Sequence, residues 1–230
     1  MQKVGDDLWV HDDSMKLAGT KLRLRMTVVK LANGSLWVHS VTALSPELKQ
    51  EIDQIGEVKH IVAASNAHNT WLQDWCEAYP EAEAYVSAGI PRKVPLSNYH
   101  ILRDGFENVW EEDLSWEFMP AVPMFNETVF FHKKTQSLIV TDLIQNYPDH
   151  VPTGFAGIMT KYVFQPIGFK GTCIAPPLKM GFMIKDKPKF TEFIRHVQSW
   201  DFKRIIVTHG DIIEENAKSV FTDLCVRFLK

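Results

Sequence analysis

The feature that most constrains the fold of this sequence is a pattern of predicted elements that occurs twice. Each copy begins with two short runs of β-branched and aromatic residues joined by a turn, and continues with helix, buried strand and helix. The first turn is Asn33-Gly34, a pair that suits a two-residue hairpin, and the second spans Lys134 to Gln136. Because no low-complexity linker separates the copies, we expect one domain, 1–230, with two facing sheets and helices outside.

Local signals place further elements around the two hairpins. Ser45 and Pro46 have the cap and first-turn positions of a short amphipathic helix at 45–56. For the Phe-, Met- and Gly-rich stretch at 154–183 we favour an ordinary buried helix over a lid or an oligomer interface. The acidic, tryptophan-rich stretch at 103–118 receives no assignment. Apolar strands are expected at 58–65, 137–142 and 203–211, and further helices at 69–80, 187–202 and 212–228.

Composition and charge narrow the functional classes. The 230-residue chain is 45% hydrophobic, and none of its apolar stretches reaches the length of about eighteen residues that spans a bilayer. Its start lacks the basic and apolar regions of a secretory signal, so we expect a cytoplasmic protein without a membrane partner. The net charge of −3, with acids and bases interspersed, argues against nucleic acid as a partner. Three cysteines without a CxxC pair favour reduced thiols.

Two smaller observations concern charged and catalytic motifs. The run at 21–26 alternates strictly, so we expect a strand whose leucines and methionine face inward and whose lysine and arginines, including Arg25, face water. The nucleophile elbow G-x-S-x-G, the phosphate-binding P-loop, the dinucleotide motif G-x-G-x-x-G and the helix motif H-E-x-x-H are all absent. The enzyme classes that depend on those motifs are therefore excluded.

Polar residues that can bind a metal follow three separate apolar strands. They are His68, Asp142 and His209. Because a rigid sheet brings its strand ends together at one rim, the three side chains are expected to share a zinc or ferrous ion. Such an ion lowers the pKa of a bound water toward about 7 and makes it a nucleophile. Each residue also has a structural explanation on its own: Asp142 as a turn cap, His209 as a hydrogen-bonded rim histidine and His68 as part of the first helical turn.

These segments together resemble the metallo-β-lactamase superfamily and, within it, a family whose domain has no assigned function. The resemblance covers nearly the whole chain and depends on the combined pattern of four segments, at 26–40, 44–90, 129–144 and 200–211. It implies an α/β fold, the αβ/βα four-layer sandwich of two facing mixed β-sheets flanked by helices, with a metal site at one edge.

The resemblance also implies where metal ligands are missing. The superfamily signature His-x-His-x-Asp-His falls on Asn66, His68, Thr70 and Trp71, so three of its four ligands are replaced. In the nearer family, adjacent histidines would fall on His68 and Asn69, and only the first is present. A second ion thus loses its ligands at Thr70 and Trp71, and the indole of Trp71 would fill the volume of that ion.

The other motif positions keep groups that bind metal. Glu127 stands where a further histidine is expected, Asp142 matches the aspartate that bridges two ions, and His209 matches the last histidine. The resemblance implies one divalent ion, zinc foremost with iron or manganese as alternatives, and assigns Asp142 to position the attacking water as well. The implied ligands are His68, Glu127, Asp142 and His209, and the residues expected around them are His39, Asn66 and Asn69.

Two functions follow from this resemblance. The first is a metal-dependent hydrolase with a reduced, single-ion site that acts on a small molecule with an ester, amide, lactone or phosphodiester bond. The alternative is a scaffold without catalysis or metal that binds a small ligand or a protein partner in the former cleft. We favour the hydrolase, because three metal-binding groups at matching strand ends outweigh the losses at Asn66, Thr70 and Trp71.

Overall fold

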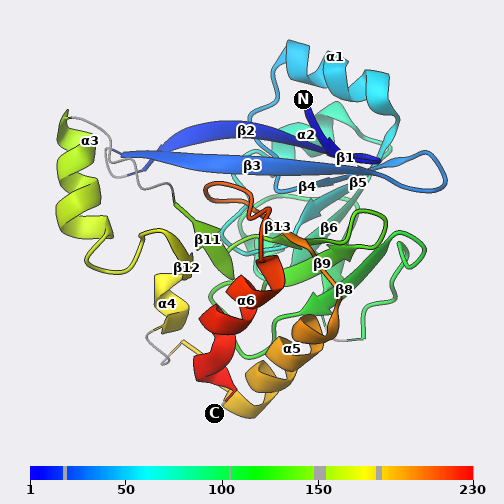
Figure 1. Cartoon of the computed structure of the whole chain (residues 1–230). Helices are drawn as coiled ribbons and strands as arrows, with labels where there is room; N and C mark the ends of the chain where they lie inside the picture. The colour runs from blue at the N-terminus through cyan, green and yellow to red at the C-terminus, as the bar shows by residue number, and fades with distance from the viewer. Residues whose placement is uncertain (18–19, 104, 148–153, 180–182, 230) are drawn as a thin grey trace.

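Two β-sheets face each other and helices cover their outer faces, as the sequence predicts (Figure 1). The structure is a computed structural model, and it describes residues 1–17, 20–103, 105–147, 154–179 and 183–229. No helix in those ranges is long and apolar enough to cross a membrane.

The first sheet is mixed and has seven strands that are hydrogen-bonded in chain order. The first four pair antiparallel, as hairpins do, whereas the last four form parallel ladders that need crossover connections. The strands are β1 (Gln2–Gly5), β2 (Leu8–Leu17), β3 (Thr20–Lys30), β4 (Leu36–His39), β5 (Val58–Ala63), β6 (Glu83–Ser87) and β7 (Tyr99–Leu102).

The first predicted hairpin is present, but its loop is longer than two residues. Strands β3 and β4 pair antiparallel as far as Lys30 and Leu36, which leaves residues 31–35 as the loop. Gly34 has a φ of +86°, in the left-handed region that glycine tolerates best. The Asn33-Gly34 signal therefore marks the correct reversal of the chain, although not the exact turn length.

The second sheet has four strands in the order β13-β10-β9-β8. Strands β9 and β10 are the second predicted hairpin, and β10 runs parallel to β13. A separate two-stranded sheet, β11 with β12, lies next to it. The bounds are β8 (Leu114–Phe118), β9 (Thr128–His132), β10 (Ser137–Val140), β11 (Ile144–Asn146), β12 (Thr172–Ile174) and β13 (Arg204–Val207).

Helices form the two outer layers. α1 (Pro46–Ile55) and α2 (Leu72–Ala78) pack on the first sheet, and α5 (Lys187–Ser199) and α6 (Ala217–Cys225) pack on the second. The Ser45 hydroxyl accepts the N–H of Leu48 at 3.1 Å, which confirms the predicted cap of α1. Shorter elements are α3 (Gly154–Met159), a π-helical turn (Thr160–Phe164), α4 (Pro176–Lys179) and two 3-10 turns (Ile90–Arg92 and Val226–Phe228).

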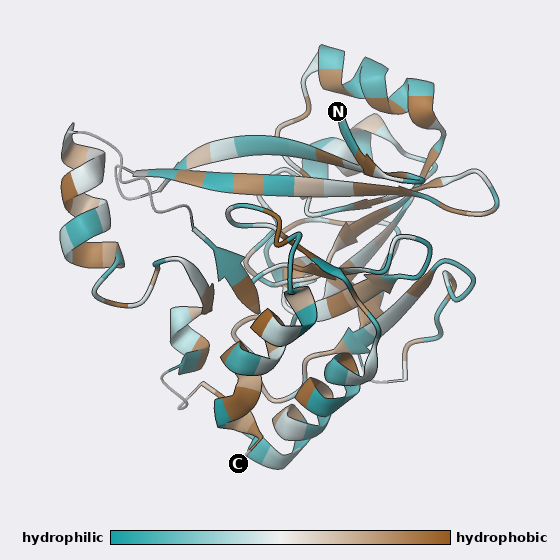
Figure 2. Ribbon diagram, in the orientation of Figure 1, coloured by the Kyte–Doolittle hydropathy of each residue, from teal (hydrophilic) through white to brown (hydrophobic). Residues whose placement is uncertain are grey.

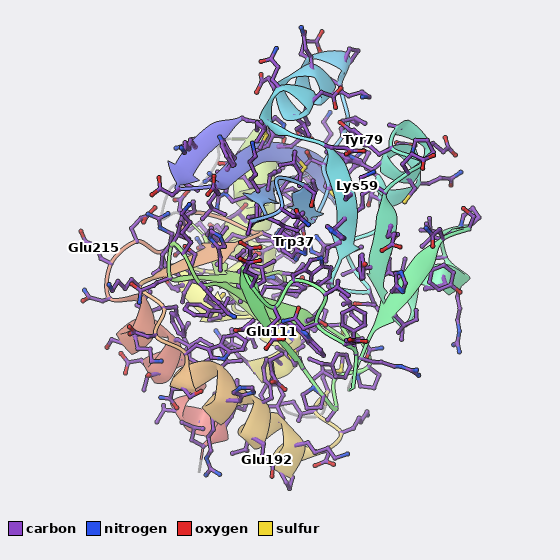
Figure 3. The ribbon with its side chains drawn as sticks, turned by 90° about the vertical axis from the view of Figure 1, so that its right-hand side faces the viewer. Trp37, Lys59, Tyr79, Glu111, Glu192 and Glu215 are labelled. Atoms are coloured by element: carbon purple, nitrogen blue, oxygen red, sulfur yellow. The ribbon has the colours of Figure 1, made fainter. Side chains whose placement is uncertain are left out.

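A core of aromatic residues fills the space between the two sheets. Trp37 of β4 and Phe130 of β9 meet edge to face with ring centroids 4.9 Å apart, and Trp110 packs against both. Figure 3 shows Trp37 near the centre of the molecule, whereas Glu192 and Glu215 lie at its periphery. Burial of each large apolar side chain contributes about 1.5–3 kcal/mol. The unassigned segment at 103–118 thus supplies Trp110 to the core and strand β8 to the second sheet.

The expectation of a buried helix at 154–183 is wrong for most of that stretch. α3 and the π-helical turn lie on the surface beside the far end of the β2–β3 hairpin (Figures 1 and 2). Phe155 is 64% exposed and Tyr162 is 67% exposed. Only the later part of the stretch, with Cys173, Ile174 and Leu178, joins the core, and residues 180–182 lie outside the described ranges.

Candidate metal centre

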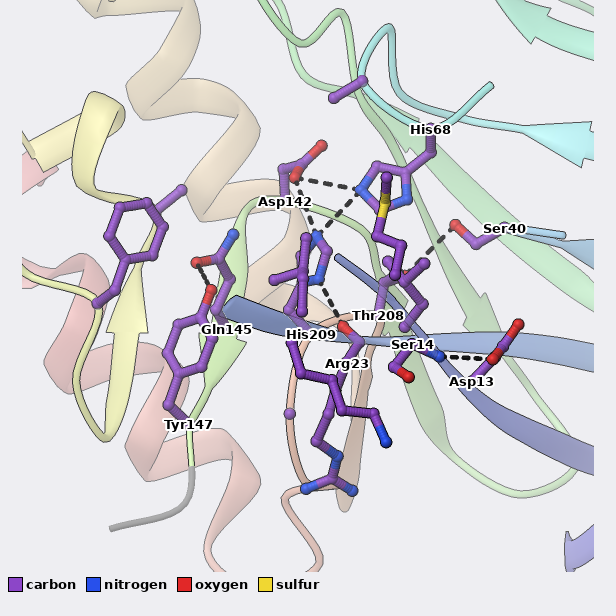
Figure 4. A pocket seen from close by; sticks show the side chains of 18 of the residues that line it. Asp13, Ser14, Arg23, Ser40, His68, Asp142, Gln145, Tyr147, Thr208 and His209 are labelled. Atoms are coloured by element: carbon purple, nitrogen blue, oxygen red, sulfur yellow. Dashed lines mark hydrogen bonds and ion pairs between the residues drawn. The ribbon is translucent and has the colours of Figure 1, made fainter. Parts of the chain in front are cut away.

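Three of the predicted ligands lie together at one edge of the sandwich. His68 is in the loop after β5, and Asp142 and His209 each stand two residues beyond the parallel strands β10 and β13. Because those strand ends share one edge, the three side chains meet there (Figure 4). The positional argument from the sequence is therefore correct for these residues.

The donor atoms of the three side chains converge. Nε2 of His68 lies 3.1 Å from Nε2 of His209. Oδ1 of Asp142 lies 3.4 Å from Nε2 of His68 and 3.7 Å from Nε2 of His209. Asp142 and His209 are buried, and the side chain of His68 is only 12% exposed.

This arrangement fits one divalent ion. Two imidazoles and a carboxylate are ligands that zinc and ferrous iron both accept. An ion that holds such ligands at about 2.0–2.2 Å in a tetrahedron spaces them about 3.4 Å apart, and the three observed separations run from 3.1 to 3.7 Å. Three protein ligands also leave a fourth position for water or substrate.

The backbone fixes the tautomer of His209. Its Nδ1 lies 3.0 Å from the carbonyl oxygen of Arg23. A carbonyl can only accept a hydrogen bond, so Nδ1 carries the proton and the Nε2 of neutral His209 presents a lone pair to the cluster. Ligand histidines in metal sites are held in this manner by the second ring nitrogen.

Asp142 is held by a hydroxyl and stays ionised. Its Oδ2 accepts the Ser65 hydroxyl at 2.5 Å, which leaves Oδ1 to face the two histidines. Burial alone would raise the pKa of Asp142, but the charges and hydrogen bonds that His68 and His209 supply in their protonated forms outweigh burial and hold that pKa well below its usual value. Sequence reasoning missed Ser65, which directly follows the apolar run of β5.

Glu127, the fourth predicted ligand, lies outside the cluster. Its Oε1 accepts the N–H of Thr141 at 2.7 Å and its Oε2 accepts the N–H of Asp142 at 3.0 Å. Burial, followed by the negative charge of Asp142, raises the pKa of Glu127 to about 8. In this structure Glu127 therefore supports the backbone that carries Asp142, and the cluster that could hold an ion contains three residues rather than the predicted four.

The structure gives separate roles to the three residues expected around the ligands, which are His39, Asn66 and Asn69. His39 is buried, stacks on Trp37 and lies 3.2 Å from the Thr141 hydroxyl, beside Asp142. Burial, and secondarily the charge of His68, lowers the pKa of His39 to about 3, so this imidazole is neutral.

Asn66 and Asn69 organise the loop instead of pointing polar atoms at the cluster. The Asn66 side chain accepts the N–H of Gly89 at 2.9 Å and donates to the carbonyl of Pro123 at 3.1 Å. Asn69 donates its amide N–H to the carbonyl of Asn66 at 2.9 Å. Trp71, at the last signature position, is partly buried against the core under α1 and α2.

The β2–β3 hairpin clamps the loop that carries His209, which corrects the expectation that Arg25 faces water. Arg25 is 5% exposed and donates to the carbonyls of Val207 at 3.2 Å and Gly210 at 2.7 Å. Its guanidinium also pairs with Asp12 on β2: Nη2 donates a hydrogen bond of 2.8 Å to Oδ2, and Nε lies 2.7 Å from Oδ1 in an ion pair. Strict alternation alone could not reveal this, because the covering loop comes from the other end of the chain.

The cluster opens into a cavity of about 960 Å³. One wall is the hairpin, with Met15 and Leu22, and another is the segment after α3, with Phe164 and Phe169. Thr70 and Trp71 also line it. A cavity of this size, mostly apolar with a few convergent polar groups at one end, is typical of small-molecule sites.

Solved metallo-beta-lactamases share this fold. The DIM-1 enzyme superposes with a TM-score of 0.65 at 12% identity, over 98% of this chain and 95% of that one. The enzyme from Pontibacter korlensis gives 0.59 at 12% identity, over 97% and 96%. The flavodiiron core of Flv1 from Synechocystis gives 0.67 at 10% identity, over 98% of this chain and 59% of that one. At such low identities the likeness shows the fold alone.

No curated protein matches the sequence. A family of domains matches it over residues 5–166, a range that includes His39, His68, Glu127 and Asp142 but not His209. The match covers well over half of the chain. This protein, with a metallo-β-lactamase fold, belongs to the family described as "Domain of unknown function (DUF4336)".

Proposed function

We propose that this protein is a metal-dependent hydrolase with a single divalent ion held by His68, Asp142 and His209. The observation that carries the proposal is the convergence of two Nε2 atoms and one carboxylate oxygen, 3.1 to 3.7 Å apart, in the lining of a cavity. When bound there, such an ion would activate a water molecule for attack on a polarised carbonyl or phosphoryl group.

The side chains around the ion have separate roles in this proposal. Asp142 uses one oxygen toward the ion and, with its lowered pKa, remains an acceptor that orients the attacking water. Arg23 and Ser65 hold His209 and Asp142 in place. Met15, Leu22 and Phe164 form apolar walls that bind the substrate and exclude bulk water.

The first test is metal content. Protein purified without added metal is expected to contain about one equivalent of zinc, iron or manganese, measured by inductively coupled plasma mass spectrometry. Iron is tested beside zinc because the fold is shared with a protein described as a flavodiiron core. His209→Ala should lose the ion, whereas His196→Ala, at an exposed position on α5, should keep it. Folded wild-type protein that neither contains nor takes up metal would contradict the proposal.

Activity is tested separately from metal binding. The metal-loaded protein is assayed on chromogenic esters, amides, lactones and phosphodiesters, with and without a chelator. The proposal predicts turnover of one class that the chelator abolishes and the metal restores.

A scaffold that binds a ligand without metal remains the second candidate. It is favoured by the loss of ligands at Asn66, Thr70 and Trp71, and by the 3.1 Å contact through which His68 can donate directly to His209. On this alternative, adding zinc leaves the melting temperature unchanged, whereas a resident ion stabilises the folded state by mass action.

A further inference from the structure

Five large apolar side chains are exposed together on α3, the π-helical turn and the bend that follows. We call this set the α3 surface; its members are Phe155, Ile158, Tyr162, Val163 and Ile167, and each is between 41% and 67% exposed. Phe155, Ile158 and Tyr162 are three and four residues apart, a spacing that puts them on one side of the helix.

The α3 surface stands out from the rest of the described surface. Nine large hydrophobic residues are exposed in the described ranges, and five of them lie between 155 and 167. The other four are scattered singly at Tyr99, Val109, Met124 and Val226, which is ordinary for a protein surface. A gathered apolar surface on one helix instead indicates an interaction site.

The segment that carries the α3 surface has charged residues of one sign. Residues 151–185 contain four lysines and no aspartate or glutamate, although the whole chain has a net charge of −3. The ammonium of Lys161 lies 5.4 Å from the centre of the Tyr162 ring, within the apolar set. Lys170 is also exposed, where the following segment reaches the cavity.

The neighbouring hairpin adds two lysines near its end, whereas its carboxylates, Asp12 and Asp13, lie farther along β2. α3 contacts β3, and Figure 1 shows the end of the β2–β3 hairpin beside it. Near that end, Lys16 and Lys21 are paired across the two strands and both are exposed. Like charges on directly paired residues repel each other, so a negatively charged surface next to this pair would relieve the repulsion.

We propose that the α3 surface docks on an anionic lipid surface, with the helix lying in the plane of the interface. Aromatic and aliphatic side chains beside lysines are the composition by which interfacial helices bind anionic lipid. The expectation of no membrane partner considered only a spanning segment, which this mode of binding does not need. A second copy of the chain fits less well, because residues 151–185 of each copy would present lysines and no carboxylate.

Docking in this orientation would bring the cavity wall to the lipid surface. Residues from the same segment, Phe164, Gln165 and Phe169, line the cavity that leads to His68, Asp142 and His209. The docking proposal itself does not depend on metal, and its test is run in the presence of a chelator. Failure of docking and failure of the metal proposal are thus separate results.

The test is flotation of the full-length protein with lipid vesicles. The protein is expected to float with phosphatidylcholine–phosphatidylglycerol vesicles, to stay unbound with phosphatidylcholine alone, and to dissociate as salt is raised. The double variant Ile158→Ser/Tyr162→Ser should weaken binding about tenfold or more. Lys161→Gln should weaken binding about fivefold. Both changes are at exposed positions, and circular dichroism checks that the fold is kept.

Matched controls change the same chemistry elsewhere. The double variant Val109→Ser/Val226→Ser removes two exposed apolar side chains outside the α3 surface, and Lys187→Gln removes a charge on α5, on another side of the molecule (Figure 1). These variants should bind like wild type. No flotation, equal binding to neutral vesicles, or unchanged binding of the α3 variants overturns the proposal. A dimer in sedimentation velocity that Ile158→Ser/Tyr162→Ser dissociates also overturns it and assigns the surface to a second copy.

Discussion

At the scale of single residues, each buried side chain of the proposed metal site is oriented by a group outside the cluster. The carbonyl of Arg23 fixes the ring of His209, and the Ser65 hydroxyl takes one oxygen of Asp142. Glu127 receives the N–H groups of Thr141 and Asp142, and so shapes the turn from which the Asp142 side chain projects. Only the convergence of His68, Asp142 and His209 was predictable from the sequence, because the spacing of residues after strands says nothing about which neighbour will orient them.

Ser65→Ala tests this orienting role. The change removes the 2.5 Å bond and leaves Oδ2 of Asp142 buried without its partner. Loss of such an orienting bond costs about 10- to 100-fold in metal affinity, measured by competition with a chromophoric chelator. The control is Ser137→Ala, which removes another buried hydroxyl, bonded to Thr135 at 2.9 Å, at the opposite end of β10. Equal metal affinities for the two variants would exclude the role given to Ser65.

At the scale of elements, the site depends on a contact between opposite ends of the chain. The β2–β3 hairpin grips the loop after β13 through Arg25, and the ion pair of Arg23 with Asp211, at 2.6 Å, adds a second point of attachment. Gly210 allows that loop to pack closely, because a Cβ at this position would lie 1.8 Å from the Asn146 carbonyl oxygen.

Arg25→Met should loosen the grip on the His209 loop. The variant leaves the carbonyls of Val207 and Gly210 without their donor and Asp12 without its charge partner, so unfolding becomes easier by about 2–4 kcal/mol and metal affinity falls about tenfold. Urea unfolding and chelator competition measure the two effects. Arg204→Met is the control, because Arg204 pairs with Glu214 at the start of β13, away from the ligands. Arg204→Met should lower the free energy of unfolding without changing metal affinity. An equal loss of metal affinity in both variants would contradict the role of Arg25 in holding the His209 loop.

The elements themselves were largely predictable from local signals. The Ser45 cap, the Asn33-Gly34 reversal and the two hairpins are confirmed, because short-range chemistry decides them. The burial of Arg25 and the exposure of most of the stretch at 154–183 were not predictable, because distant segments set the environment of both. Alternation predicted solvent around a buried arginine, and apolar composition predicted burial for a helix that is exposed.

At the scale of the whole molecule, buried titratable groups give stability a predictable dependence on pH. Burial lowers the pKa of His39, His60 and His132 below the value of about 6.5 found in unfolded chains. Their contribution to stability is therefore complete above that value and is lost as pH falls through it. Glu127 acts in the opposite sense, because its raised pKa lets the folded state keep a proton between about 4.5 and 8 that the unfolded state releases.

On unfolding, the three histidines take up more protons than Glu127 releases. The metal-free protein should therefore be less stable at pH 5.5 than at pH 7.5. Each net proton taken up on unfolding changes the free energy by about 1.4 kcal/mol per pH unit. Urea unfolding with chelator present measures the difference, and His132→Gln should reduce it. A higher free energy of unfolding at pH 5.5 than at pH 7.5 would contradict the expectation that the buried histidines outweigh Glu127.

The central claim is that His68, Asp142 and His209 hold one ion, and anomalous scattering tests it most directly. A crystal grown without added metal, with data collected above and below the absorption edges of zinc, iron and manganese, is predicted to show one anomalous peak. That peak would lie among the two Nε2 atoms and Oδ1 of Asp142, with Glu127 still bound to the backbone. Well-ordered side chains in direct hydrogen-bond contact, with no anomalous peak between them, would contradict the claim.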